Sequence, residues 1–248
     1  MTPILSISGL AKRFGGVTAT DSLSLDILPG EIHAIIGPNG AGKTTLIGQL
    51  SGEIAPDAGT IRFKDADITR LPVHRRALRG LARSFQITSV LRGFTACENV
   101  MLAVQAHAGH SFRFWQPAAT QAALRDPALA MLARVGLAGR ADVPAADLAH
   151  GEQRQLEIAM ALAGRPDLLL LDEPMAGMGP EESARMTGLL AGLKASHSIL
   201  LVEHDMDAVF RLADRITVLV YGRAIATGTP DAIRADAAVR QAYLGGEA

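Results

Sequence analysis

The stretch GPNGAGKTT, residues 37 to 45, limits what this chain can fold into more than any other part of its sequence. The β-like run EIHAIIG (31–37) leads into it, and the helical pattern of 43–50 follows it. Glycines at this spacing let the backbone wrap closely around phosphate oxygens, so that successive N–H groups and a helix N-terminus point at the anion. The sequence therefore predicts an α/β fold with a phosphate-binding loop for a nucleoside triphosphate, formed by Gly37, Pro38, Asn39, Gly40, Ala41, Gly42, Lys43, Thr44 and Thr45.

Two side chains of this loop have direct chemical roles in the prediction. Lys43 is expected to reach the β- and γ-phosphates, and the Thr44 hydroxyl is expected to ligate Mg²⁺. A glycine loop that merely joins a strand to a helix is a poor alternative, because the spacing, the lysine and the threonine all agree.

A pair of acids, Asp172 and Glu173, follows the apolar run LLLL (168–171). They come at the C-terminal end of a predicted buried strand, where ligands of open α/β sheets bind. Asp172 is a candidate Mg²⁺ ligand, and Glu173 is a candidate for orienting or deprotonating the attacking water. Two acids after a strand are by themselves commonly a helix cap, but their combination with a phosphate-binding loop favours the catalytic interpretation.

One histidine and one glutamine complete the predicted site. His204 follows the strand-like run SILLVE and is predicted to contact the γ-phosphate from the same sheet edge. Gln86 lies where the β-rich and helical parts of the sequence meet, and is a candidate for contact with Mg²⁺, with the attacking water and with the hinge. The other histidines are interpreted as structural or surface residues: His33, His74, His107, His110, His150 and His197.

Composition excludes several classes of protein. With 48% hydrophobic residues, the 248-residue chain can bury a substantial core. Its 24 basic and 25 acidic residues nearly cancel, which argues against a nucleic-acid partner. The single cysteine, Cys97, cannot form an intramolecular disulfide and is interpreted as a small apolar filler. There is no signal-peptide pattern and no run of about 20 apolar residues, so we expect a cytoplasmic protein whose membrane role depends on a partner.

The chain alternates between β-rich and helical parts. Early strand-like runs (4–7, 22–27 and 59–63) favour a small antiparallel layer. Residues 95–140 are rich in Ala and Leu at helical spacing, whereas uniformly apolar strands after 168 favour a parallel sheet buried on both faces. We therefore expect a core lobe of residues 1–86 and 168–248 and an inserted helical lobe of residues 87–167.

The stretch LAHGEQ, residues 148 to 153, places a glycine just ahead of a second helix pattern, 152–164. A helix start with free N–H groups attracts anions, but the first loop already occupies the ligand edge of the sheet. Two chains facing head to tail would place each helix start over the nucleotide of the other chain. This predicts a dimer that ATP closes and hydrolysis opens.

These motifs, in this order, resemble those of the ATP-binding subunits of ABC transporters, and the resemblance extends from about Ile4 to Leu244. GPNGAGKTT resembles the Walker A loop, LLLLDE the Walker B motif, Gln86 the Q-loop glutamine and EHD the switch-histidine loop. LAHGEQ resembles the LSGGQ signature, so Ala149, His150, Gly151 and Glu152 are expected to contact the nucleotide of the partner. Phe14 resembles the aromatic residue that stacks on adenine.

The resemblance also implies partners: integral-membrane permease subunits, a second ATP-binding subunit that is the same chain or a paralogue and, indirectly, a periplasmic or extracellular solute-binding protein. FGGVTA, LEIAMAL, VEHDMDAVF and the C-terminal region are similar to the branched-chain amino-acid importers, and also to the lipopolysaccharide-extracting ATPase. Ala149 replaces the signature serine and Gly179 replaces the usual acidic residue after the Walker B motif. We expect these changes to slow turnover or to make it more dependent on partners.

Three rival functions belong to other classes. A chromatin or repair ATPase would carry long coiled-coil insertions, and a translation factor of this type would carry two such heads and basic arms; neither feature is in the sequence. A non-catalytic regulatory module is the third, and Ala149 and Gly179 are the residues that favour it.

Overall fold

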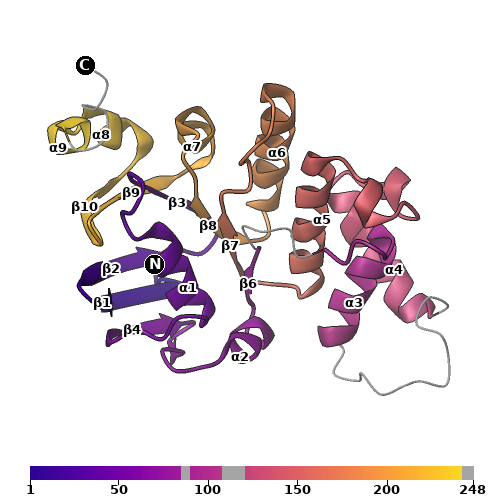
Figure 1. Ribbon diagram of the computed structural model, residues 1–248, viewed down its shortest axis with the longest axis horizontal. Helices are drawn as coiled ribbons and strands as arrows, with labels where there is room; N and C mark the ends of the chain where they lie inside the picture. Colours follow the sequence, from indigo (N-terminus) through magenta and orange to yellow (C-terminus); the bar gives the residue numbers. More distant parts are fainter. Residues whose placement is uncertain (85–89, 108–120, 242–248) are drawn as a thin grey trace.

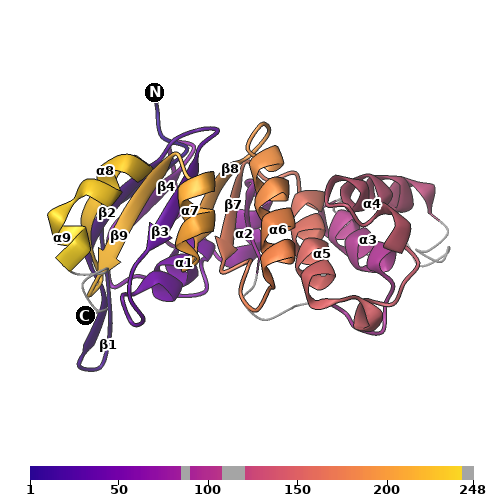
Figure 2. The same cartoon turned by 90° about the horizontal axis from the view of Figure 1, so that it is seen from above.

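The computed structural model describes residues 1–84, 90–107 and 121–241. Two sheets and their flanking helices occupy one end of an elongated molecule, and a group of helices occupies the other (Figures 1 and 2).

The smaller sheet is antiparallel and has four strands in the order β2-β1-β4-β5. Its long hairpin pairs Leu5 with Ile27 at one end and Phe14 with Val17 at the other. The predicted antiparallel layer is confirmed, but the two hairpin strands extend well beyond 4–7 and 22–27. Their distal ends, around Phe14 and Val17, are exposed and show no buried apolar alternation, so backbone pairing holds them together there. The strands are β1 (Leu5–Phe14), β2 (Val17–Ile27), β4 (Ala58–Phe63) and β5 (Ala66–Asp67).

The larger sheet has six strands in the order β10-β9-β3-β8-β7-β6. Neighbours from β9 to β6 pair in parallel, as the uniformly apolar runs predicted, whereas β10 returns antiparallel to β9. Every residue of β3, β7 and β8 is buried. The strands are β3 (Ile32–Ile36), β6 (Leu81–Arg83), β7 (Leu168–Asp172), β8 (Ser198–Val202), β9 (Arg215–Val220) and β10 (Arg223–Gly228).

Alternate residues of the buried strands face two different apolar layers. Leu169 and Leu171 belong to the cluster that contains Leu190 of α6, whereas Leu170 belongs to the cluster with Leu46 of α1 and the antiparallel sheet. Helices therefore cover both faces, which is why these strands lack alternation. The flanking helices are α1 (Lys43–Ser51), α2 (Val73–Leu78), α6 (Pro180–Leu193), α7 (Met206–Leu212), α8 (Pro230–Ala235) and α9 (Ala237–Val239). Sequence patterns missed the short β6 and α2.

The helical end consists of α3 (Ala96–His107), α4 (Ala122–Arg134) and α5 (His150–Ala163), with single 3₁₀ turns at Ala138–Arg140 and Ala145–Asp147. Cys97 lies in its core, only 1% exposed, as an apolar filler would. The apolar cluster of these helices continues through α6 onto the parallel sheet, so the helical end packs firmly on the core. The exact lobe boundaries stay a prediction. Within the described part of the chain, no helix is long and apolar enough to cross a bilayer.

Candidate functional site

The loop from Gly37 to Gly42 joins β3 to α1 and turns around the ammonium group of Lys43. Lys43 Nζ donates to the carbonyl oxygens of Gly37 at 2.6 Å and of Pro38 at 3.1 Å. Burial lowers the pKa of Lys43, and the negative charges of Glu173 and Asp172 oppose that shift. Asn39, Gly40 and Thr44 are exposed at the loop surface. A cation inside a ring of backbone groups at a helix N-terminus is the arrangement that binds phosphates.

Backbone contacts fix this loop between two hairpins. Gly222 N, in the turn between β9 and β10, donates to Ala41 O at 2.9 Å, and Asp21 N of β2 donates to Gly222 O at 2.9 Å. Gly42, the N-cap of α1, has a φ of 101°, and a Cβ there would lie 2.0 Å from Ala19 O. The antiparallel sheet thus packs directly against the phosphate-binding loop.

Asp172 ends β7 as a buried carboxylate, only 1% exposed. Arg83 Nη2 of the neighbouring strand β6 donates to Asp172 Oδ2 at 3.2 Å. Burial raises the pKa of Asp172, and the positive charge of Arg83 partly opposes that shift. Asp172 Oδ1 is buried and accepts no hydrogen bond from any described residue. The sequence did not predict the contact between Arg83 and Asp172. Nothing in the short run LAR indicates a strand that lies next to the strand of Asp172.

Glu173 and His204 follow β7 and β8, which are adjacent strands. Glu173 has a left-handed φ of 49°, and its N–H donates to Val202 O at 2.8 Å. His204 Nδ1 lies 4.0 Å from Glu173 Oε1, and the His204 side chain is 60% exposed. The Glu173 side chain is only 24% exposed, so an exposed histidine and a half-buried glutamate lie side by side next to the buried Asp172.

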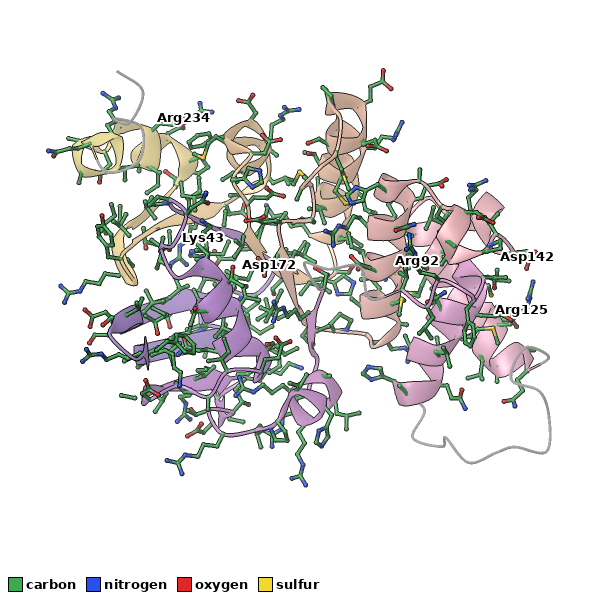
Figure 3. All side chains as sticks on the ribbon, viewed as in Figure 1. Lys43, Arg92, Arg125, Asp142, Asp172 and Arg234 are labelled. Carbon is green, nitrogen blue, oxygen red and sulfur yellow. The ribbon has the colours of Figure 1, made fainter. Side chains whose placement is uncertain are left out.

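The structure brings four of the predicted residues, Lys43, Asp172, Glu173 and His204, to one edge of the parallel sheet. Figure 3 shows Lys43 and Asp172 in the middle of the molecule, away from the helical end that carries Arg125 and Asp142. Within the described residues, no cluster of three or more His, Cys, Asp or Glu side chains could hold a metal alone. The predicted Gln86 lies outside the described residues.

Phe14 lies at the far end of β1, where it pairs with Val17. Its ring is 51% exposed, and Lys12 Nζ lies 5.4 Å from the ring centroid. The same hairpin carries Ala19, whose carbonyl faces Gly42. An exposed aromatic ring on the hairpin next to the loop has the exposure that base stacking requires.

The signature stretch differs in detail from the prediction, because α5 begins at His150 with Ala149 as its N-cap, and Gly151 lies inside its first turn. Glu152 explains the earlier start. Its carboxylate accepts from Ala149 N at 2.9 Å and pairs with Arg140, Nε to Oε1 at 3.0 Å. Glu152 therefore stabilises the start of the helix.

The signature stretch and the phosphate-binding loop of one chain lie apart. In both Figure 1 and Figure 2, β7 and β8 lie between α1 and α5. The start of α5 instead packs near α6, where a Cβ on Gly151 would be 2.9 Å from Glu182 Oε1. A cavity of about 400 Å³ opens here, lined by residues that include Ala149, Gly151, Glu182 and Arg185. Gly179 is the N-cap of α6.

Comparison with known proteins agrees with this geometry. Residues 20–176 match the family model described as ABC transporter, and residues 225–248 match the model described as branched-chain amino acid ATP-binding cassette transporter. The chain is 41% identical over 255 residues to the high-affinity branched-chain amino acid transport ATP-binding protein LivG of Escherichia coli, covering 98% of each chain. It is 40% identical over 250 residues to BraF of Pseudomonas aeruginosa, a protein of the same description, again covering 98% of each.

Solved structures give the same answer for the fold. The crystal structure of the ADP conformation of an ATP-binding cassette from an ABC transporter superimposes with a TM-score of 0.87 at 28% identity, covering 99% of this chain and all of that one. The predicted α/β architecture, with an antiparallel layer and an inserted helical region, is confirmed.

Proposed function

Because the chain belongs to the ATP-binding proteins of ABC transporters, we propose that it binds and hydrolyses ATP as one half of a dimer that drives uptake of branched-chain amino acids or similar small polar solutes. The observation that carries this proposal is end-to-end similarity to amino-acid transport ATP-binding proteins, joined to the convergence of Lys43, Asp172, Glu173 and His204 on one sheet edge. The C-terminal match favours amino-acid import over lipopolysaccharide export.

The residues of the phosphate-binding loop hold the nucleotide. Backbone N–H groups of the loop, which Pro38 lacks, donate to the phosphate oxygens, and the Lys43 ammonium neutralises part of their charge. Lys43 exchanges its two carbonyl contacts for phosphate oxygens. Phe14, exposed on the adjoining hairpin, stacks on the adenine.

Asp172 and Thr44 suit a Mg²⁺ ion. The buried, unpaired Asp172 Oδ1 is a costly arrangement unless a cation satisfies it, and carboxylate and hydroxyl oxygens are the ligands that Mg²⁺ prefers. When bound, Mg²⁺ supplies charge neutralisation at the phosphates. Arg83 holds the second Asp172 oxygen, which leaves the first available. We propose from the sequence that Gln86 also contacts the Mg²⁺ ion.

Glu173 orients and deprotonates the attacking water, and His204 contacts the γ-phosphate. The Glu173 side chain is mostly buried, whereas the His204 side chain is mostly exposed to solvent. An exposed side chain is accessible to a phosphate that binds at this edge of the sheet. The two side chains lie close enough to act on the same centre.

The signature residues of a second copy complete the site. In one chain α5 is separated from the loop by β7 and β8, so the free N–H groups near Gly151 reach a phosphate only across a dimer. Ala149, His150, Gly151 and Glu152 then form that contact without a signature hydroxyl. We place the dimer on the cytoplasmic face of the membrane, where it is bound to permease subunits. A solute-binding protein delivers the solute to these permease subunits.

The proposal is tested with the transporter assembled from this chain and its permease subunits in liposomes. We expect ATP-dependent uptake of labelled leucine and an ATPase rate per molecule of the purified chain that rises with its concentration. A rate per molecule that is rapid and independent of dilution would contradict the shared site. Uptake of other solutes but not of leucine would contradict the amino-acid assignment.

A further inference from the structure

Glu203 is a buried acid between the two loops that carry Glu173 and His204. It directly follows β8, and its side chain is fully buried. One carboxylate oxygen, Oε1, accepts from Met175 N at 2.9 Å. The other, Oε2, accepts from His204 N at 2.9 Å and from Asp205 N at 3.4 Å. One side chain thus holds backbone groups from two separate loops.

The electrostatics make this placement costly for folding. Burial raises the pKa of Glu203, and the three backbone hydrogen bonds only partly oppose that shift. Such a group is destabilising relative to an apolar side chain of the same shape unless its hydrogen bonds compensate for the desolvation of the carboxylate. A buried acid that bridges two loops is therefore better explained by the geometry it holds than by the stability it adds.

The two loops need an external constraint to keep their geometry. Glu173 has a left-handed backbone, so the direction of its side chain depends on the turn that continues through Met175. The His204 side chain is 60% exposed, and the buried side chain beside it is Glu203, whose Oε2 lies 3.7 Å from His204 Nδ1. A second hydrogen bond joins the same two parts of the chain: Ser183 Oγ of α6 donates to Asp205 Oδ2 at 3.2 Å. Both links tie the segment after β7 to the segment after β8.

We propose that Glu203 is a positioning residue that sets the separation of Glu173 and His204 and moves the loop of residues 173–179 together with residues 203–205. The inference rests on the proposed ATPase function. Through this link, contact of His204 with a γ-phosphate is transmitted to the segment that ends at Gly179, the N-cap of α6.

The test compares Glu203→Gln with a matched control, Glu31→Gln. Glu31 is another buried glutamate that accepts a backbone N–H, from Leu28 at 2.7 Å, but it lies at the start of β3, the opposite end of the sheet. In Glu203→Gln the carboxamide N–H₂ group faces backbone donors on one side, so the side chain no longer holds the two loops together and both are released. We expect kcat for ATP, measured with the permease complex, to fall about 10- to 100-fold, as misplacement of a catalytic group by about 1 Å does. We expect KM and nucleotide affinity to change less than about twofold, because Lys43 and its loop are untouched. Glu31→Gln should reduce stability and leave kcat unchanged.

A double-mutant cycle separates positioning from general destabilisation. If Glu203 acts through His204, then Glu203→Gln should cost much less in a His204→Ala background than in the wild type. An equal loss in both backgrounds, or an unchanged kcat, would overturn the proposal.

A readout that needs no turnover distinguishes failure of this inference from failure of the proposed function. Hydrogen exchange should speed up at Met175 and Asp205 together in Glu203→Gln and at neither in Glu31→Gln. Faster exchange at only one of the two loops refutes the link. A wild-type complex without ATPase activity would instead refute the proposed function, even if exchange at the two loops rises together.

Discussion

Replacing Gly42 by alanine tests whether contact with the antiparallel sheet shapes the phosphate-binding loop. Gly42 has a φ of 101°, and its added Cβ would lie 2.0 Å from the carbonyl oxygen of Ala19, a backbone atom of β2. A left-handed non-glycine residue costs about 1–2 kcal/mol, and forcing a backbone shift in a packed region costs about 1–3 kcal/mol. We therefore expect Gly42→Ala to lower the free energy of unfolding by about 3 kcal/mol, or the melting temperature by about 6–12 °C.

Gly40 provides the matched control inside the same loop. It is also left-handed, with a φ of 78°, but a Cβ there meets no atom within 4 Å. Gly40→Ala should therefore cost only the backbone term, about 1 kcal/mol. Denaturant titration of the nucleotide-free protein measures both values, with unchanged m-values as the check on two-state unfolding. Because the clash also displaces the start of α1, Gly42→Ala should lose ATP affinity in a fluorescent-nucleotide titration. Equal losses of stability in the two variants would refute the reasoning.

Further predictions concern the charged groups of the site and a buried histidine. Lys43→Ala should abolish ATP binding measured by titration calorimetry, and Glu173→Gln should accumulate an ATP-bound dimer on gel filtration; a strict monomer at saturating MgATP would count against the shared site. Arg83→Met should destabilise the protein by about 3 kcal/mol, because it leaves the Asp172 carboxylate buried without its partner, and adding Asp172→Asn should recover part of that loss in the same unfolding assay. Burial lowers the pKa of His197 below 6.5, so the unfolded chain takes up a proton first as the pH falls through 6.5. Stability should then decrease below that pH until the folded-state pKa is passed, and a curve of the same slope in His197→Gln would disprove this cause.

Local patterns were sufficient where one element determines the geometry. The glycine-rich loop was predicted with its strand and helix, because backbone conformation and phosphate binding depend on the same few residues. The buried strands after 168 were predicted from their apolar runs. The start of α5 was predicted two residues late, since the cap depends on Glu152 folding back onto Ala149 N and a glycine pattern does not report that contact.

Residues whose roles depend on distant partners were not found from the sequence. Arg83 matters because β6 lies beside β7 in the sheet, 89 positions away in the chain from Asp172. Glu203 matters because Met175, 28 positions away, donates its N–H to it. Neither residue has a spacing signature, because no local physical constraint links such partners before the sheet forms.

The sequence by itself specified the candidate groups of this protein: a glycine-rich loop between a strand and a helix, two acids and a histidine at strand ends, and a second helix start that contains a glycine. Each depends on residue type and on neighbours within one turn or one strand. The tertiary structure decided which of these groups meet. Parallel pairing of β3, β8 and β7 brings Lys43, His204 and Asp172 to one edge, and the same pairing separates them from α5, because the order of strands in a sheet is set by long-range packing.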